Sequence, residues 1–241
     1  QFWGQTLDTD KEPMLTADAA KKVYQVAFTY NNEVKAARYA NSGKTVSLPT
    51  IKDFMGTGYN PHHYYTIAFA GGFNGSTTVN ADRTVAINLT EKDCYEIASK
   101  DNWIEFSNIV YDGQNAVDAK MTADVDLGGD FKTIGGVHKY SGTFDGQGHT
   151  LTVNWAADNA GLKAPFGYVD GATIKNLRTE GSINSNTYGL SGLIYSLEGI
   201  TTISGCVSNV NLTSRYSLSS GCDASGMVHH VTSGASAEFT D

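Results

Sequence analysis

Apolar and polar residues alternate in short runs from Val23 to about Leu89. Two sets of apolar residues each share one parity: Tyr24, Val26, Phe28 and Tyr30, and then Val85, Ile87 and Leu89. A period of two is typical of strands that bury one face. We therefore predict a small β-rich domain over residues 22–92. Residues 1–21 show no such period, and we interpret them as a linker or a frayed terminus.

One later segment has the period of a helix instead. Its apolar residues recur three to four positions apart: Trp103, Phe106, Ile109 and Val110. Asn102 and Glu105 have the spacing of a capping box, and Gly113 offers the left-handed conformation that often closes a helix. We predict an amphipathic helix that starts near Asn102 and ends near Tyr111.

Beyond this helix, the chain becomes rich in Gly, Thr, Ser and Asn and repeats itself. Residues 173–177 (TIKNL) align with residues 202–206 (TISGC) at a shift of 29 positions. The same shift matches two further pairs: Thr179 with Ser208, and Ile183 with Leu212. A second short apolar element precedes each of three copies, at residues 166–169, 193–195 and 227–229.

Such a unit cannot bury its apolar face alone, whereas stacked copies form a continuous core. We therefore expect an all-β chain in which residues 94–241 form a β-solenoid. The first layer of a solenoid exposes strand edges and apolar side chains, which natural proteins cover. The predicted helix is in position to be this cover, with Trp103 and Phe106 against the first layer.

The same region resembles a known family. The segments that carry the resemblance are residues 123–127 (ADVDL), 131–135 (FKTIG), 140–150 (YSGTFDGQGHT), 172–177 (ATIKNL), 192–194 (GLI) and 203–206 (ISGC). The first three segments look like the start of bacterial surface β-helix domains, and the last three are similar to the GLUG-type repeats of these domains. The resemblance implies a right-handed parallel β-helix on a secreted or cell-surface bacterial protein. The chain departs from the family pattern at Asn154 and Trp155, and at Gly205, where the family usually has Asn.

The first domain carries a looser resemblance. Residues 27–30, 43–49 and 81–85 resemble the small β-grasp repeats of Listeria and Bacteroides surface proteins. This resemblance also implies a location at the bacterial surface or outside the cell.

The charge of the chain excludes some classes of partner. There are 17 basic and 25 acidic residues, a net charge of −8, and the basic residues form no run longer than Lys21 and Lys22. Nucleic acids and anionic membranes are therefore not expected partners. No segment approaches the roughly 18 uncharged apolar residues of a membrane-spanning helix. Cys94, Cys206 and Cys222 are odd in number and lack CxxC spacing, which supports neither a disulfide framework nor a zinc site.

The candidate catalytic residues are carboxylates and basic side chains of the predicted solenoid. Asp124 and Asp126 would share one face of a strand, where carboxylates can hold calcium or transfer protons. We favour the alternative, in which they accept hydrogen bonds from backbone amides. Asp145, in the run DGQG, fits an Asx turn better than a catalytic role. An enzyme would most readily add these residues: Lys132, His138, Lys139 and Asp145.

The remaining motifs indicate no cofactor. The paired histidines at 62–63 and 229–230 point to opposite faces of a strand, and no metal-binding spacing occurs, so we expect no metal. Phosphate-loop and nucleophile-elbow patterns do not occur either. Three tyrosines in or beside the repeats could stack on sugars or anchor a partner: Tyr188, Tyr195 and Tyr216. Packing over the strands is the favoured alternative for each one.

These observations lead to two functional hypotheses. The first is a non-enzymatic surface or secreted protein, adhesin-like or structural, that presents a solenoid face to a glycan or a protein. The second is a carbohydrate-active enzyme, a lyase or hydrolase, on the same fold. The third repeat stops at Asp241 before its second half, so we also expect further layers, a cap or a second chain beyond this residue.

Overall fold

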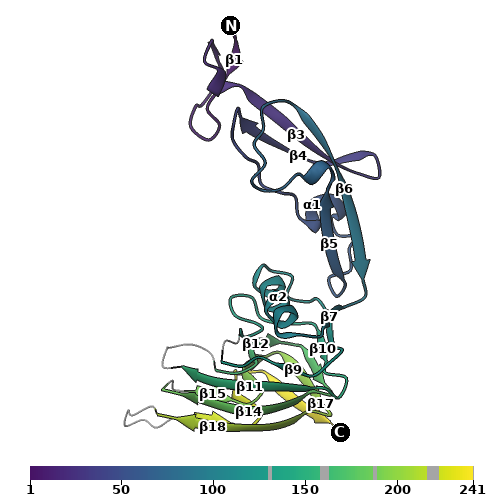
Figure 1. Ribbon diagram of the computed structural model, residues 1–241, viewed down its shortest axis with the longest axis vertical. Coiled ribbons are helices and arrows are strands. Elements are labelled where there is room, and N and C mark those ends of the chain that lie inside the picture. Colours follow the sequence, from purple (N-terminus) through teal and green to yellow (C-terminus); the bar gives the residue numbers. More distant parts are fainter. Residues whose placement is uncertain (130–131, 158–162, 187–188, 216–222, 241) are drawn as a thin grey trace. The chain divides into compact units, whose positions relative to one another are not determined.

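The computed structural model describes residues 1–129, 132–157, 163–186, 189–215 and 223–240 of a β-rich chain (Figure 1). The chain divides into two compact units. Unit 1 comprises Gln1–Asn60 and Tyr65–Glu91, and unit 2 comprises Pro61–Tyr64 and Lys92–Asp241.

Unit 1 is built around one mixed four-stranded sheet. Its elements are β1 (Phe2–Gly4), β2 (Met14–Thr16), the 3-10 helix η1 (Ala19–Lys21), β3 (Val23–Tyr30), β4 (Glu33–Asn41), α1 (Ile51–Met55), β5 (Tyr64–Phe69), the 3-10 helix η2 (Ala70–Gly72) and β6 (Arg83–Lys92). The strand order is β4-β3-β6-β5, with β3 antiparallel to β4 and parallel to β6. Val26, Phe28, Val85 and Ile87 are buried in its core, as the alternation predicts.

The structure differs from the sequence-based expectation at residues 1–21. Instead of a linker or frayed end, β1 and β2 pair antiparallel as a two-stranded sheet, in which Trp3 lies opposite Leu15. Asp10 helps to close the connecting loop, because its carboxylate accepts a hydrogen bond from the Thr6 amide and forms an ion pair with Lys21. Short pairings held by such polar contacts leave no apolar period for sequence reasoning to detect.

The described part of unit 2 consists of one helix and sheets of parallel strands. Its elements are β7 (Tyr95–Ile97), α2 (Lys100–Tyr111), β8 (Ala119–Met121), β9 (Val125–Asp126), β10 (Thr143–Asp145), β11 (Thr150–Ala157), β12 (Phe166–Asp170), β13 (Thr173–Lys175), β14 (Arg178–Ser185), β15 (Gly189–Ser191), β16 (Ile194–Glu198), β17 (Ile200–Ser204), β18 (Val207–Ser214), β19 (Asp223–Ser225), β20 (Val228–Val231) and β21 (Ser236–Thr240).

The chain visits these sheets in turn. The strand orders are β21-β17-β13-β10-β8-β7, β18-β14-β11-β9, β12-β16-β20 and β15-β19. Every strand pair recorded within them is parallel. In each sheet, neighbouring strands therefore come from successive passes of the chain.

The pairing register matches the repeat found in the sequence. Thr173 lies opposite Thr202 in β13 and β17, and Thr179 lies opposite Ser208 in β14 and β18. The predicted match of Ile183 with Leu212 is also a cross-strand pair. The shift of 29 residues is therefore confirmed as a structural register in these two sheets.

The helix α2 begins earlier than predicted. Its N-cap is Ser99, whose hydroxyl oxygen accepts a hydrogen bond from the Asn102 amide, so Asn102 is not the cap. The Asn102 side-chain oxygen in turn accepts hydrogen bonds from the Ser99 hydroxyl and the Ala98 amide. Glu105 accepts a hydrogen bond from the Tyr95 hydroxyl instead of closing a capping box. The predicted end is confirmed, because the helix stops at Tyr111 and Gly113 has a φ of +94°.

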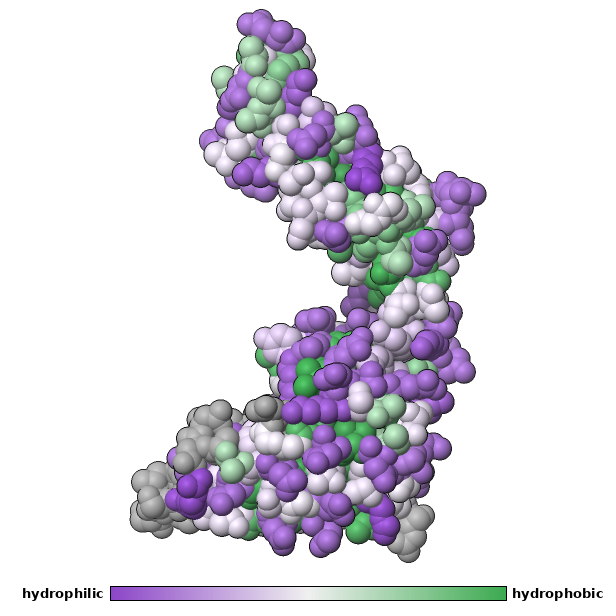
Figure 2. Space-filling model, viewed as in Figure 1, coloured by the Kyte–Doolittle hydropathy of each residue, from purple (hydrophilic) through white to green (hydrophobic). Residues whose placement is uncertain are grey.

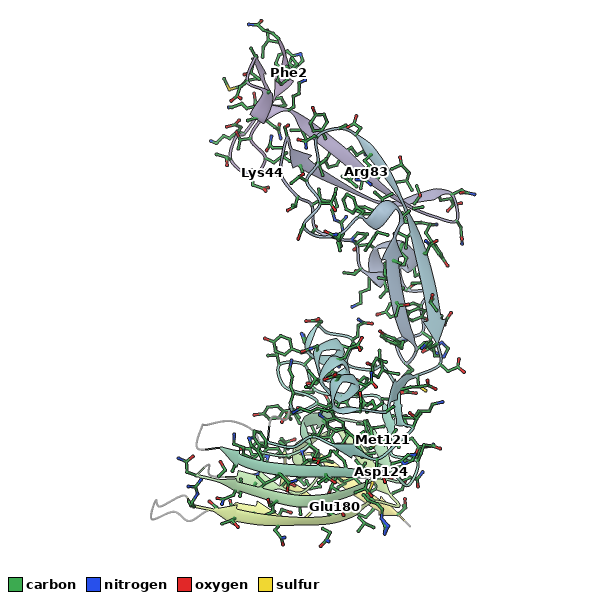
Figure 3. All side chains as sticks on the ribbon, in the orientation of Figure 1. Phe2, Lys44, Arg83, Met121, Asp124 and Glu180 are labelled. Atoms are coloured by element: carbon green, nitrogen blue, oxygen red, sulfur yellow. The ribbon has the colours of Figure 1, made fainter. Side chains whose placement is uncertain are left out.

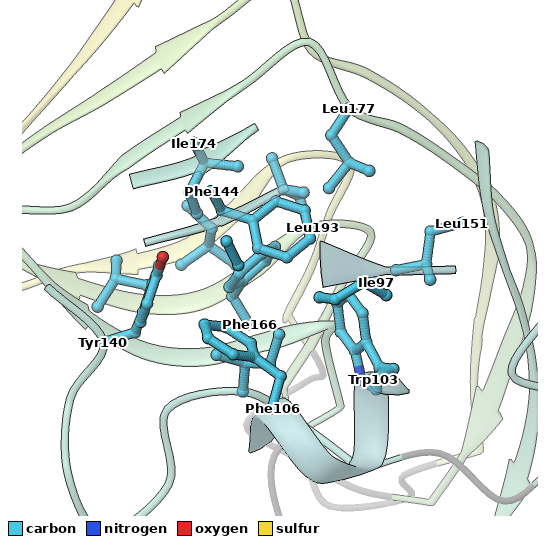
Figure 4. Close-up of a cluster of buried hydrophobic side chains, with 14 of the residues drawn as sticks. Ile97, Trp103, Phe106, Tyr140, Phe144, Leu151, Phe166, Ile174, Leu177 and Leu193 are labelled. Carbon is cyan, nitrogen blue, oxygen red and sulfur yellow. The ribbon is translucent and has the colours of Figure 1, made fainter. Parts of the chain in front are cut away.

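The apolar face of α2 packs on the first strands of the parallel sheets (Figure 4). Trp103 and Phe106 are fully buried, as predicted. The Trp103 ring meets Phe144 of β10 and Phe166 of β12 edge to face, at centroid distances of 5.7 and 5.9 Å. One continuous core follows, which runs from the helix through Ile174 to Ile203.

Candidate binding groove

Three chain turns lie side by side at one corner of unit 2. They connect β10 to β11, β13 to β14, and β17 to β18. Each contains a residue with a left-handed backbone: Gln147 has a φ of +53°, Asn176 of +52° and Gly205 of +57°. Amide groups link the successive turns, since Gly148 donates to the Asn176 carbonyl and Asn176 donates to the Ser204 carbonyl, each at 2.8 Å.

An open groove of about 510 Å³ crosses these turns. It is lined by two residues from each turn or its following strand: Gln147, Gly148, Asn176, Arg178, Gly205 and Val207. Its size falls in the range of about 300 to 1,000 Å³ that is common for small-ligand sites. The surface of unit 2 in the view of Figure 2 is mostly hydrophilic, with hydrophobic residues scattered between polar ones.

Arg178 is the charged residue among the described residues that line the groove. Its side chain is exposed and forms no ion pair with any residue that the structure describes. Across the sheet, Arg178 lies between Thr150 of β11 and Val207 of β18, so its cross-strand neighbours carry no charge. The described lining of the groove therefore combines the Arg178 guanidinium with the amide residues Gln147 and Asn176, two glycines and Val207.

Asp145 borders this corner and is tied into the turn. Its carboxylate accepts hydrogen bonds from the Gln147 amide at 2.9 Å and from the Asn176 side chain at 3.1 Å, and it pairs with Lys175. The first bond is the Asx turn predicted from the sequence. Burial raises the pKa of the Asp145 carboxyl, but these three donors outweigh burial and hold the pKa below its ordinary value.

The carboxylates of Asp124 and Asp126 bind different partners. Asp124 accepts hydrogen bonds from the Thr150 amide at 2.9 Å and pairs with His149 at 3.1 Å. The Thr150 amide, followed by His149, holds the pKa of Asp124 below its ordinary value. Asp126 accepts from the Gly128 amide at 2.8 Å. Figure 3 labels Asp124, which directly precedes β9, and Glu180 on β14, a strand of the same sheet.

The basic candidates lie elsewhere in unit 2. The Lys132 ammonium contacts the Asn108 side chain and the Tyr111 ring of α2. The His138 ring lies beside Gly113, just after the same helix. Lys139 pairs with Glu198. The structure thus places Asp124 and Asp145 beside the turn from β10 to β11, but places Lys132 and His138 against α2 and the segment that follows it.

The Tyr195 candidate packs against neighbouring rings, and two of the three cysteines are partly buried. The Tyr195 ring stacks on His229 at a centroid distance of 4.9 Å and meets Tyr168 edge to face. Tyr188 and Tyr216 lie outside the described residues, as does Cys222. Cys94 and Cys206 are free thiols, and burial raises the pKa of each.

Sequence reasoning did not identify the groove. The repeat shift carries residues 176–178 onto residues 205–207, so it brings Arg178 beside Val207 and Asn176 beside Gly205. That alignment was a signal for stacked turns. It carried no signal for a groove, because whether neighbouring turns leave a hollow depends on side-chain volume and backbone path.

No group of three or more His, Cys, Asp or Glu side chains that could hold a metal occurs in the described part of the chain. Among the same residues, no helix has the length and apolar character to cross a membrane. Comparisons with protein-family models, with curated proteins and with solved structures find no match to this chain.

Proposed function

We propose that unit 2 is a right-handed parallel β-helix of the GLUG type on a bacterial surface or secreted protein, and that it binds a glycan or a protein without catalysis. The corner groove is the observation that carries this proposal. It crosses three successive turns, and it offers amide, guanidinium and apolar contacts in one place.

The fold part of the proposal is supported by the strand registers. Successive passes of the chain add one parallel strand to each sheet, and apolar residues fall on apolar residues between passes, as with Phe144, Ile174 and Ile203. Right-handed crossovers are the rule for parallel strands. For unit 1 we propose a β-grasp-like domain, which is consistent with a mixed sheet and the short helix α1 between β4 and β5.

A carbohydrate-active enzyme is the second candidate, and one contact favours it. The Asp124 carboxylate holds the His149 imidazole through Nδ1, next to Gly148 of the groove lining. A carboxylate in this position orients the ring of a general base. The two candidates predict different outcomes in one assay, since the enzyme releases product and the binding protein does not.

The test is a binding screen of the full chain against neutral and acidic glycans and surface proteins, with and without calcium, followed by analysis of the bound material for cleavage. The groove variant is Val207→Trp, because Val207 is 49% exposed and a larger side chain there fills the groove. Val137→Trp is the matched control, since Val137 is 70% exposed and does not line the groove.

We expect binding without product, lost in Val207→Trp and kept in Val137→Trp. Equal binding by both variants would refute a groove site. Product formation that requires His149 would replace the binding function by the enzymatic one.

A further inference from the structure

We infer that the groove selects an acidic saccharide, whose carboxylate or sulfate group pairs with Arg178. This inference rests on the proposed binding function and adds the chemical class of the ligand. It follows from which groups at the corner are already engaged and which remain open to a ligand.

Three carboxylates lie near Arg178, and each accepts a hydrogen bond from another residue. Glu180, two residues along β14 on the same exposed face, accepts one from the Thr152 hydroxyl at 3.3 Å. Asp145 is held by Lys175, Asn176 and the Gln147 amide. Asp124 is held by His149 and the Thr150 amide. Arg178 is thus left exposed in the groove without an ion pair among the described residues.

A guanidinium in this state suits an oxyanion with two oxygens in reach. Its N–H groups form a fixed fork that matches a carboxylate or a sulfate through two parallel hydrogen bonds. The backbone of Arg178 is fixed by its place in β14, where its amide donates to the His149 carbonyl at 3.1 Å. The side chain therefore extends from a rigid strand and not from a loop.

The rest of the groove suits the body of a sugar. Gln147, just before β11, lines the groove at one side of Arg178, and the apolar residue Val207 of β18 lines it at the other. Gly205 adds no side chain to the lining, and a Cβ atom there would lie 2.8 Å from the Asn176 side-chain oxygen. The groove spans two strand spacings, about 9.5 Å, which admits a short oligosaccharide.

An acidic peptide fits this corner less well. A peptide gains much of its affinity from backbone hydrogen bonds to an open strand edge. The backbone amides of the lining are engaged within the protein: Gly148 with Asn176, Asn176 with Ser204, Arg178 with His149, Gly205 with Thr240, and Val207 with Leu177. Among the lining residues, side-chain donors are what remains, and hydroxyl and acidic groups of a saccharide use such donors.

The experiment measures the affinity of the full chain for three matched oligosaccharides by titration calorimetry. One is a uronate oligomer, the second is the same oligomer with its carboxylates reduced to alcohols, and the third is a sulfated oligomer. Arg178→Gln removes the guanidinium, and Arg178→Lys keeps the charge without the fork. Lys92→Gln is the matched control, because Lys92 is an exposed unit 2 residue outside the groove and the variant has the same net charge.

We expect Arg178→Gln to weaken acidic binding by about tenfold or more, the usual effect of losing a hydrogen-bonded charge. Arg178→Lys should recover part of the affinity, and Lys92→Gln should match the wild type. The uronate and sulfated arms then tell which acidic group is preferred.

Two results would overturn the inference and leave the proposed function in place. One is equal affinity of the wild type for the uronate and its reduced form. The other is displacement of the uronate by a Glu-rich peptide that binds more tightly. Failure of every saccharide and protein to bind at the groove would instead refute the proposed function itself.

Discussion

The parallel sheets of unit 2 end in two different ways. At one end, α2 covers the first strands and buries Trp103 and Phe106 completely. At the other end, β18, β20 and β21 are the last strands of their sheets. There Phe239 is 59% exposed and Val207 is 49% exposed.

The repeat itself does not close either end. A strand inside one of these sheets pairs with a neighbour on both sides, whereas the first and last strands of a sheet pair on one side only. A helix is suited to this role because its backbone hydrogen bonds are internal and its apolar face can lie on open strands. The sharpest tests compare substitutions at the covered and the exposed end.

The largest effect is expected at the covered end, for Trp103→Ala. The substitution removes the ring that packs on Phe144 and Phe166 and also the indole N–H that donates to the Lys132 carbonyl at 2.6 Å. We expect a loss of about 3–5 kcal/mol in the free energy of unfolding, the usual range for a buried aromatic residue. Urea denaturation followed by circular dichroism measures it.

Trp103→Phe separates the two contributions in the same assay. It keeps an aromatic ring against the core but removes the indole donor, so its loss should be clearly smaller than that of Trp103→Ala. A negligible effect of Trp103→Ala would mean that α2 does not stabilise the parallel sheets.

The next effect concerns the interior of the stack, at Asn176. This residue has a φ of +52°, and its side chain donates to Asp145. Asn176→Ala loses the hydrogen bond and places an alanine in a left-handed conformation, which together cost about 1–3 kcal/mol. Asn176→Gly loses only the hydrogen bond and should be less destabilising. The reverse order of the two variants in urea denaturation would contradict the strain argument.

A smaller, pH-dependent effect is expected towards the exposed end. Burial lowers the pKa of His229 of β20 from its ordinary value of 6.5, with Asp223 acting in the opposite direction and His230 in the same one. The folded state therefore takes up this proton less readily than the unfolded chain. Above about pH 6.5 the imidazole is neutral in both states, and this group does not lower the free energy of unfolding. The free energy of unfolding decreases as the pH falls from about 6.5 to the lower folded-state pKa.

Hydrogen exchange of the β16 and β20 amides, measured at pH values from 7 to 5 and corrected for the intrinsic pH dependence of exchange, detects this effect. His229→Gln should remove the part of the pH dependence that is specific to these strands. The amides of β8 and β10, near α2, serve as the internal control. A pH response that is equal in all four strands would exclude His229 as its source.

The sequence predicted those features of the fold that depend on apolar periodicity. Burial follows from residue type, so apolar residues mark the buried positions. This holds for the alternation around Val26 and Val85, for the helical face of Trp103 and for the shift that pairs Ile183 with Leu212. The helix start was wrong because Ser99 and Asn102 are both good capping residues, and only the backbone path selects between them. The groove was missed because no motif surrounds Arg178 in the sequence. Its cross-strand neighbours, Thr150 and Val207, lie 28 and 29 residues away along the chain.

The smallest effect is expected for Phe239→Ala, and its matched control makes it informative. Phe144, Ile174, Ile203 and Phe239 occupy one register position in four neighbouring strands, but Phe144 is fully buried and Phe239 is mostly exposed. Phe144→Ala should therefore cost about 3–5 kcal/mol, whereas Phe239→Ala should cost about 0.5 kcal/mol, as for a surface residue. Urea denaturation of both variants at several protein concentrations provides the measurement. A large loss for Phe239→Ala that grows with protein concentration would show that a second copy buries this end in solution. The two ends would then differ in exposure only in the monomer.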